Sequence, residues 1–502
     1  MKPKNIHIPS LLLLFALVFS ACTPRAAVRP GDFDSLTAAL DAEMPHLLNA
    51  YRVPGASIAI VKDGELAWSK GYGLADKENL VPAAPDTVYQ IASISKTVAA
   101  WGIMRLVEQG KLDLDAPVSQ YLTRWQLPPS EFSADGVTIR RLLSHSAGLS
   151  VHGYPGYAPD SRLPSLEESL SGATLGPNYA VKIVTEPGTV FSYSGGGYTM
   201  LQLIVEEVSG QNFAAFMQQE IFTPLGLNQS SYSWREDLRS RTARPYDTSG
   251  NLLPNYLFTE LAAAGEYTTA EDLARFGQAH LPGPAGKPAG GGLLTEESLR
   301  QMREVVIAIP PNSFEGYISG MDGYGLGCYV ETLPDGSRAI SHTGGNKGWR
   351  SLLIAAPEQQ SVLVVLTNSD NGSGIHEEVR ARWAEWLGTG TPKGIEHLST
   401  LTNLISAVSV LLLIGFGWWA FRFASAVAYG KRRFQLVPDL RKRAGWRLVL
   451  GLLAALFLTA LWFFLGLLFV GAIFPLQASL VGAAVMAWVL ALALSTASAR
   501  VL

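Results

Sequence analysis

The stretch VYQIASISKTVAA, residues 88–100, holds a serine and a lysine three residues apart, Ser93 and Lys96. Apolar residues recur after it at a spacing compatible with a helix: Val98, Trp101, Ile103, Met104, Leu106 and Val107. In a helix that begins near Ser93, both side chains share a face beside free backbone N–H groups and the positive end of the helix dipole. That position suits a nucleophile whose attack creates an oxyanion. It equally suits an ordinary N-cap serine, so the rest of the chain has to decide.

Strand-like segments lie before and long after this stretch, and helical segments lie between them. Residues 55–76, GASIAIVKDGELAWSKGYGLAD, predict two strands joined by a turn at Lys62-Asp63-Gly64. Four more strands are predicted within residues 324–331, 338–345, 350–358 and 361–368. Amphipathic helices are predicted over 32–53, capped by Asp34 or Ser35, and over 375–388. This order predicts an α+β fold: one antiparallel sheet built from both ends, flanked by helices, with a mainly helical insert.

Two further short motifs stand out. Tyr193-Ser194-Gly195 directly precedes a helical pattern, and His342-Thr343-Gly344-Gly345 ends a predicted strand. Taken alone, such a tyrosine is more often a packed aromatic residue, and such a histidine a polar strand residue. Ser-x-x-Lys, Tyr-Ser-Gly and His-Thr-Gly in this order resemble the motif set of the serine beta-lactamase and penicillin-binding-protein superfamily, in its class C beta-lactamase-like branch. LLSHSAGL (142–149) and GEYTTAEDLARF (265–276) resemble two more segments of that branch.

The resemblance covers about residues 30–390 and implies a beta-lactamase/transpeptidase-like serine hydrolase domain there. It implies that Ser93 attacks a carbonyl carbon and is acylated. Lys96 and Tyr193 are then the candidate bases, and which of them takes the serine proton stays open. The implied oxyanion donors are the backbone N–H groups of Ser93 and Gly345. His145 is expected to brace a turn rather than to act in catalysis.

Two departures from the branch bear on the substrate. Gly195 stands where class C beta-lactamases have an asparagine, and His342 stands where they have a lysine. Gly195 cannot hold an acylamino group, and we expect His342 to be only partly charged near neutral pH. The expected substrate-binding residues are His342, Thr343, Gly344 and Gly195. We therefore expect a hydrolase of amides or esters (a D-peptide, a small ester or a beta-lactam-like compound), with a non-catalytic ligand-binding or partner module as the alternative.

Gross features exclude several other functions. The formal net charge of −3 over 502 residues argues against a nucleic-acid partner. The chain has no His-Glu-x-x-His or Cys-x-x-Cys pattern and no Gly-x-x-x-x-Gly-Lys-[Ser/Thr] loop, so we expect neither a metal nor another cofactor. Only two cysteines occur, Cys22 and Cys328, which rules out a disulfide framework. If Cys22 is lipidated, Cys328 is expected to be a small buried residue in a strand, with a catalytic thiol as the alternative.

The N-terminus predicts export. Lys2 and Lys4 precede the apolar run 11–19, which is too short to span a bilayer comfortably, and small residues then lead to Cys22. Residues 1–22 are thus expected to be a signal peptide. The residues before Cys22 resemble a bacterial lipobox, apart from Phe19, which implies a lipid on Cys22. Plain cleavage or retention is the alternative.

After a predicted linker at 391–398, three apolar spans of about 20 residues follow at 399–421, 448–470 and 476–497. The loop 422–447 between the first two is rich in lysine and arginine, and such loops stay in the cytoplasm. We therefore expect a multi-pass membrane protein with the hydrolase domain on the extracytoplasmic side and a cytoplasmic C-terminus. No ionisable residue lies inside the spans, so they are expected to anchor the protein in lipid, and a protein partner of the spans is not identified. A pair of helices buried in a soluble core is the alternative.

Overall fold

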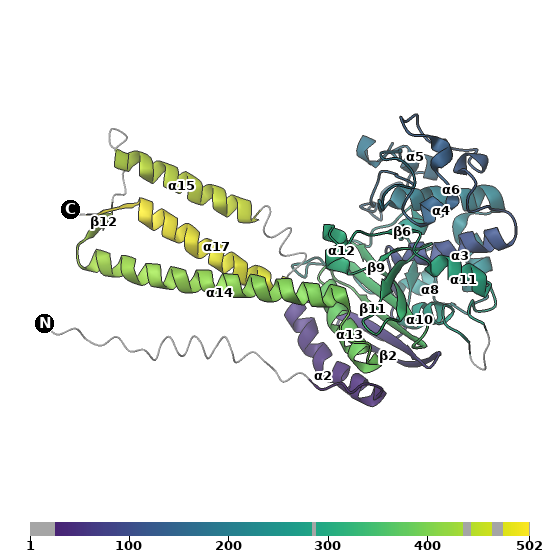
Figure 1. Cartoon of the computed structure of the whole chain (residues 1–502), viewed down its shortest axis with the longest axis horizontal. Helices are drawn as coiled ribbons and strands as arrows, with labels where there is room; N and C mark the ends of the chain where they lie inside the picture. The colour runs from purple at the N-terminus through teal and green to yellow at the C-terminus, as the bar shows by residue number, and fades with distance from the viewer. Residues whose placement is uncertain (1–25, 284–287, 435–442, 464–474, 501–502) are drawn as a thin grey trace.

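The computed structural model describes residues 26–283, 288–434, 443–463 and 475–500 (Figure 1). Its centre is one antiparallel sheet in the order β3-β2-β1-β11-β10-β9-β8-β7-β6. Strand β1 pairs with both β2 and β11. A strand from the beginning of the domain therefore lies beside a strand from its end in the middle of the sheet, as the order of the predicted strands indicated. The strands are β1 (Gly55–Lys62), β2 (Glu65–Asp76), β3 (Val81–Pro82), β6 (Ile307–Ala308), β7 (Gly323–Tyr324), β8 (Tyr329–Thr332), β9 (Arg338–Asn346), β10 (Trp349–Ala356) and β11 (Ser361–Thr367).

Helices cover both faces of this sheet. Successive side chains of a strand point to opposite faces, and the central strands β1, β10 and β11 are buried at nearly every position, so both faces need cover. Ile58 and Ile60 of β1 belong to the core shared with α2 (Phe33–Tyr51) and α13 (Ser373–Leu387). Ala59 and Val61 belong to the larger core on the other face, shared with α3 (Ile94–Glu108) and α10 (Ala270–Gln278).

The N-cap of helix α2 differs from the predicted one. Asp32 is its N-cap, in place of the expected Asp34 or Ser35. Asp32 is extended (φ −91°, ψ 95°), and its Oδ1 accepts a hydrogen bond of 3.1 Å from the backbone N–H of Ser35. An N-cap side chain accepts a hydrogen bond from a free backbone N–H of the first turn. Asp34 and Ser35 lie within that first turn, so the cap is the preceding Asp32.

The helical insert lies over the larger core, on the side of the sheet that carries α3 (Figure 1). Its longest described helix, α6 (Gly195–Ser209), is capped by the Ser194 hydroxyl, which accepts 3.1 Å from the Gly197 N–H. A short pairing of β4 (Tyr89–Gln90) with β5 (Tyr267–Thr268) joins the segment before Ser93 to the GEYTT segment. Shorter helices complete this part: α4 (Ile139–Leu143), α5 (Leu166–Leu170), α7 (Phe213–Met217), α8 (Glu236–Arg239), α9 (Leu261–Ala264), α11 (Glu296–Arg303) and α12 (Phe314–Ser319).

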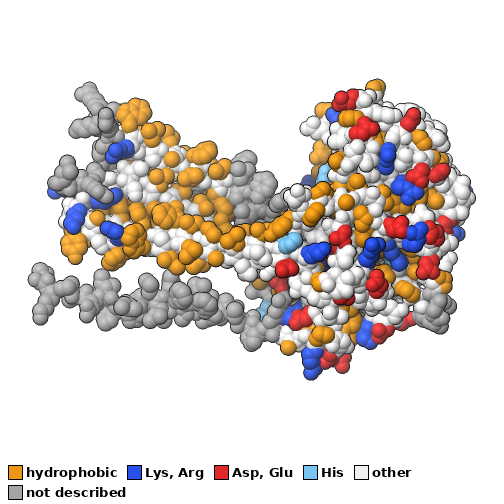
Figure 2. Space-filling model, in the orientation of Figure 1, with side chains coloured by type: hydrophobic (Ala, Val, Ile, Leu, Met, Phe, Trp, Pro, Cys, Tyr) orange, Lys and Arg blue, Asp and Glu red, His pale blue; other side chains and the backbone are white. Residues whose placement is uncertain are grey.

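A helical arm projects from this domain (Figure 1) and consists of α14 (Lys393–Ala428), α15 (Arg443–Leu461) and α17 (Pro475–Thr496). Hydrophobic side chains cover the arm, and lysine and arginine side chains gather at its far end (Figure 2). Within the described residues two helices are long and apolar enough to cross a membrane, Lys393–Ala428 and Gln477–Thr496, whereas Trp446–Leu461 is shorter. The structure thus has two clear candidate spans where three were predicted, and part of the predicted span 448–470 lies outside the described residues.

The irregular connection between the domain and the arm is short, residues 388–392 between α13 and α14. Helix α14 begins at Lys393, directly after Pro392, so it includes most of the segment 391–398 that was predicted as a linker. Proline at a helix start supplies a suitable fixed φ. The first turns of α14 pack on α12: the rings of His397 and Tyr317 stack at 4.3 Å, and His397 Nδ1 lies 2.7 Å from the Tyr317 carbonyl.

Two smaller predictions also differ from the structure. Short strand β12 (Arg432–Phe434) lies within the predicted basic loop 422–447 and pairs with β13 (Ser498–Arg500) near the end of the chain. Cys328 is buried as expected, but it lies one residue before β8 rather than in a strand. The predicted signal peptide 1–22, with Cys22, lies outside the described residues.

Candidate active site

Ser93 sits at a sharp turn between β4 and α3. It occupies the N-cap position of α3, but its side chain makes no capping hydrogen bond. The preceding residue, Ala92, is buried and has φ +49°, a left-handed conformation that costs a non-glycine residue energy. Such strained residues cluster at functional sites, where surrounding structure holds them. The hydroxyl is therefore presented at the helix start without being used by the helix.

Lys96 lies one turn further along α3 and is only 2% exposed. Its Nζ is 3.1 Å from Ser93 Oγ and donates a 2.6 Å hydrogen bond to the backbone carbonyl of Ala263 in α9. Burial lowers the pKa of Lys96 to about 7, because the protonated amine loses water without gaining a carboxylate partner within the described chain. An amine with this pKa can receive a proton near neutral pH.

Tyr193 approaches the same pair from the start of α6. Lys96 Nζ lies 5.0 Å from the centre of the Tyr193 ring. The ring packs against His145 at 4.1 Å and His152 at 4.8 Å, which fixes its position. His145 Nδ1 accepts a 3.0 Å hydrogen bond from the Ser194 N–H, so His145 braces this turn, as expected. The structure thus brings the serine, the lysine and the tyrosine of the three motifs together.

The edge of β9 borders these side chains. Strand β8 pairs with β9 only as far as Ser341, so the stretch from His342 onward has no β8 partner. Gly344 abuts the turn before the serine: an added Cβ would lie 2.1 Å from the Ile91 carbonyl oxygen. Ser351 on β10 donates a 2.7 Å hydrogen bond to the same oxygen. Thr343 and Gly345 flank Gly344 on the exposed side of the strand.

His342 differs from the expectation of a partly charged residue. It is 2% exposed, its Nε2 lies 3.0 Å from the Tyr324 hydroxyl, and its Nδ1 lies 2.7 Å from the Thr343 carbonyl. Burial, with the charge of Lys96, lowers the pKa of His342 to about 3. The expectation of partial charge was wrong, because it assumed a solvated imidazole. His342 is neutral at physiological pH.

Gly195 is the first residue of α6 and is buried. Its N–H donates a 3.0 Å hydrogen bond to the His152 carbonyl, and an added Cβ would lie 3.1 Å from that oxygen. The missing side chain therefore lets the loop that carries His152 approach the start of the helix closely.

Several residues around this cluster were not singled out from the sequence. Tyr324 and Tyr329 pack against the ring of His342, and Phe191 packs against Tyr324. Asn346 links β9 to β4 and α9 through Gln90 (2.9 Å) and the Ala264 carbonyl (3.1 Å). The sequence signal for these residues was weak and consisted of aromatic residues in FSYSGG (191–196), which contains Tyr193-Ser194-Gly195, and in YGLGCY (324–329), which was predicted only as a strand. Aromatic residues at such positions are equally compatible with a core.

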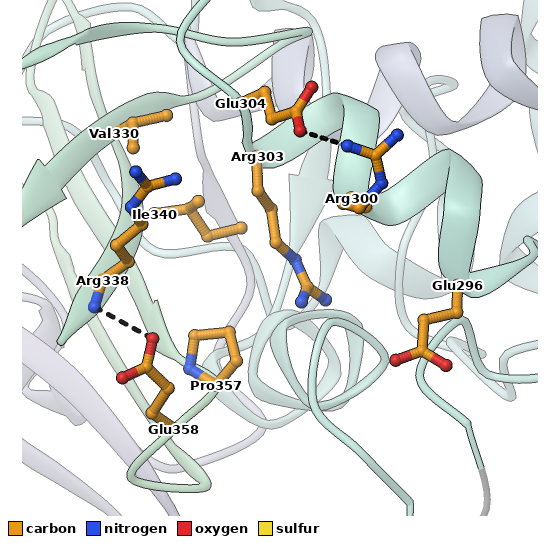
Figure 3. A pocket seen from close by; sticks show the side chains of 9 residues that line it. All are labelled: Glu296, Arg300, Arg303, Glu304, Val330, Arg338, Ile340, Pro357 and Glu358. Atoms are coloured by element: carbon orange, nitrogen blue, oxygen red, sulfur yellow. Dashed lines mark hydrogen bonds and ion pairs between the residues drawn. The ribbon is translucent and has the colours of Figure 1, made fainter.

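A separate pocket of about 310 Å³ lies between α11 and the strands β8 and β9 (Figure 3). Arginines and glutamates alternate around it, and Arg300 is paired with Glu304 there. It shares no lining residue with the cluster around Ser93; its lining consists of Glu296, Arg300, Arg303, Glu304, Val330, Arg338, Ile340, Pro357 and Glu358.

An antiparallel sheet covered by helices on both faces, with a helical insert over one of them, is the beta-lactamase/transpeptidase-like α+β fold. Residues 34–385 match the family described as Beta-lactamase, and the chain belongs to this family of serine hydrolases. Penicillin-binding protein 4 of Amycolatopsis lactamdurans is 30% identical over 356 residues, covering 69% of this chain and 89% of that protein. Protein flp of Staphylococcus aureus strain N315 is 24% identical over 366 residues, covering 72% of this chain. The chain spans 65% of the length of flp.

Solved structures agree with this assignment. The octameric penicillin-binding protein homologue from Pyrococcus abyssi superposes with a TM-score of 0.59 and 28% identity, over 70% of this chain and 77% of that one. The D-amino acid amidase from Ochrobactrum anthropi SV3, complexed with D-phenylalanine, gives a TM-score of 0.57 and 24% identity over 70% and 98% of the two chains. The likeness to the amidase shows the fold alone.

Proposed function

We propose that this protein is a membrane-anchored, extracytoplasmic serine hydrolase that acts through an acyl-enzyme on Ser93. Its substrates are amides or esters: a peptide ending in a D-residue, a small ester or a beta-lactam-like compound. The observation that carries the proposal is the 3.1 Å contact between Ser93 Oγ and the Nζ of the buried Lys96. The name of the Amycolatopsis relative, a penicillin-binding protein, supports an acylated serine.

The proposed reaction follows from these positions. Neutral Lys96, or Tyr193 beside it, accepts the hydroxyl proton while Ser93 Oγ attacks the carbonyl carbon. The oxyanion that forms receives hydrogen bonds from the N–H groups of Ser93 and Gly345, and losing one such donor costs about 3 kcal/mol in the barrier. Tyr193 then protonates the leaving group. Water attacks the acyl-enzyme, releases the acid and restores the hydroxyl of Ser93.

The proposed location rests on both ends of the chain. Residues 1–22 have the features of an export signal, with Cys22 as the lipid acceptor, and the apolar arm offers at least two helices of spanning length. The basic residues of 422–447 support a cytoplasmic position for that loop, with the hydrolase domain outside, facing its substrates. With three spans the C-terminus is cytoplasmic. Membrane lipid is then the partner of the arm.

Labelling with an active-site serine probe tests the proposal. Purified full chain is treated with a fluorophosphonate, and the adduct is located by mass spectrometry. We expect one adduct on Ser93, lost in Ser93→Ala and retained in the control Ser233→Ala, which changes an exposed serine of another loop. Labelling that survives Ser93→Ala would refute the assignment. No labelling of a folded wild-type protein would favour the non-catalytic binding module.

A further inference from the structure

A cluster of aromatic rings borders the candidate active site next to Tyr193, here named the aromatic wall: Phe191, Tyr324, Tyr329 and His342. The ring of Tyr329 lies 4.7 Å from that of Tyr324 and 5.3 Å from that of His342. Phe191 closes the group, at 5.7 Å from Tyr324 and 6.2 Å from Tyr329. Tyr324 and His342 are buried, whereas Phe191 and Tyr329 are partly exposed. The last two therefore form the part of the wall that a ligand can touch.

The aromatic wall lies on the side where the leaving group departs, a step that rests on the proposed function. Tyr193 protonates the leaving atom there, so the leaving group must lie next to its ring. That ring is 6.2 Å from His342. Phe191 is also only two residues before Tyr193 in the chain.

The charges around the wall are unusual for a site that would hold an anion. Lys96 is the only lysine or arginine that acts electrostatically on His145, His152 or His342 within the described chain, and it is already bonded to Ser93 and Ala263. The imidazole of His342 is occupied on both nitrogens by the Tyr324 hydroxyl and the Thr343 carbonyl.

The arginine of the neighbouring strand β10 is occupied too. Arg350 is paired with Gly345 across β9 and β10. Its guanidinium forms a 3.0 Å ion pair with Asp370 and donates to the carbonyls of Asn346 and Trp349. A carboxylate placed against the aromatic wall would therefore lose its water without gaining a free positive charge from Lys96, His342 or Arg350, which is costly.

We propose that the aromatic wall makes the site selective for substrates with an uncharged leaving group, an alcohol or a neutral amine, and that Tyr329 decides this selectivity. The preferred substrate is an ester or amide whose leaving group carries no carboxylate next to the scissile bond. Ser93 Oγ gives its proton to Lys96 or Tyr193 and adds to the carbonyl carbon. When the oxyanion collapses, the bond to the leaving oxygen or nitrogen breaks and the leaving atom takes a proton from Tyr193, which Lys96 replenishes where it accepted the serine proton. The aromatic wall stabilises the departing group by apolar contact.

A matched pair of esters tests this selectivity in the full chain. Both carry N-acetyl-D-alanine as the acyl part; one leaving group is D-lactate with its free carboxylate, and the other is methyl D-lactate. We expect wild-type kcat/KM to be about tenfold or more higher for the neutral ester. Tyr329→Arg should bring the ratio to about one or below by lowering KM for the acidic ester. Tyr329→Phe, the control, should keep the wild-type ratio.

The possible failures can be told apart. Hydrolysis that depends on Ser93 but favours the acidic ester, or a ratio that Tyr329→Arg leaves unchanged, overturns the selectivity and leaves the proposed function standing. Hydrolysis of neither ester, or hydrolysis that survives Ser93→Ala, overturns the proposed function itself. If Tyr329→Arg does not fold, judged by circular dichroism, Phe191→Arg puts the cation on the other exposed member of the aromatic wall, with the same expected shift.

Discussion

At the scale of single residues, Lys96 is the most informative side chain of the molecule. A lysine buried to 2% exposure is normally expensive, because an ammonium ion is strongly hydrated. Here the cost appears as a lowered pKa, about 7, and no carboxylate offsets it in the described chain. The same burial that would weaken a structural lysine produces an amine able to exchange protons at neutral pH, next to Ser93 Oγ.

The pH dependence of the reaction tests this role. Below a pKa of about 7 the amine of Lys96 is protonated and cannot accept the proton of Ser93, so kcat/KM should fall about tenfold per pH unit there and level off above it. Hydrolysis of the neutral ester between pH 5 and 9 measures the profile. Lys96→Ala should lower kcat by about 10²–10⁴-fold and remove the limb. If kcat/KM of Lys96→Ala still falls below pH 7, a group other than Lys96 causes that pH dependence.

At the scale of elements, the contact between β9 and the turn before α3 fixes the geometry of the site. Gly344 lies against the Ile91 carbonyl with no room for a side chain, and Ser351 holds that carbonyl from β10. The turn that carries Ser93 is thereby attached to the strand that carries Gly345. The two proposed oxyanion donors, from segments about 250 residues apart in the chain, are held by one contact.

Adjacent glycines give a matched test of this contact. Gly344→Ala would place its Cβ 2.1 Å from the Ile91 oxygen and 2.2 Å from Ser351 Oγ, so the backbone must move. We expect a loss of about 1–3 kcal/mol in the free energy of unfolding, measured in urea, together with loss of Ser93 labelling. In Gly345→Ala the nearest atom is Arg350 at 3.5 Å, an ordinary contact, and stability should change by less than about 0.5 kcal/mol. Equal effects of the two substitutions would contradict the packing argument.

The elements also show which features were readable in advance. The β1–β2 hairpin and strands β9, β10 and β11 were predicted because apolar runs and turn residues are local signals. The Ser93 and Tyr193 segments were recognised because their motifs are short and contiguous. The aromatic wall was not, because Tyr329 and Phe191 meet only after the insert folds over the sheet. The charge of His342 was misjudged for the same reason: its burial depends on Tyr324, and no local pattern reports that.

At the scale of the whole molecule, a domain of the beta-lactamase fold is combined with an apolar helical arm. Figure 2 shows the contrast between the mixed charged surface of the domain and the hydrophobic surface of the arm. Leu404, Leu411, Ile414 and Phe421 of α14 are more than half exposed. Apolar surface of this extent on one helix fits a bilayer better than water.

Fractionation tests the anchor. In a Cys22→Ser background, which removes the proposed lipid site, the full chain should stay in the membrane pellet after alkaline carbonate extraction. Deletion of residues 400–502 in that background should release the protein, because it removes the apolar arm and keeps the first turn of α14 that packs on α12. With Cys22 present, the shortened chain should remain membrane-bound through its acyl chains. A soluble full-length Cys22→Ser protein would contradict the anchor.

The unbroken start of α14 also limits where the enzyme can work. A helix of 36 residues is about 54 Å long, of which a bilayer core takes about 30 Å. Because the contact between Tyr317 and His397 fixes the first turns of α14 to α12, the remaining turns form a rigid connection between the domain and the apolar segment, not a flexible linker. If α14 spans the bilayer as proposed, this connection holds the candidate active site at a fixed height above the lipid headgroups. Molecules tethered to the cell surface would then be processed only if their scissile bond reaches that layer.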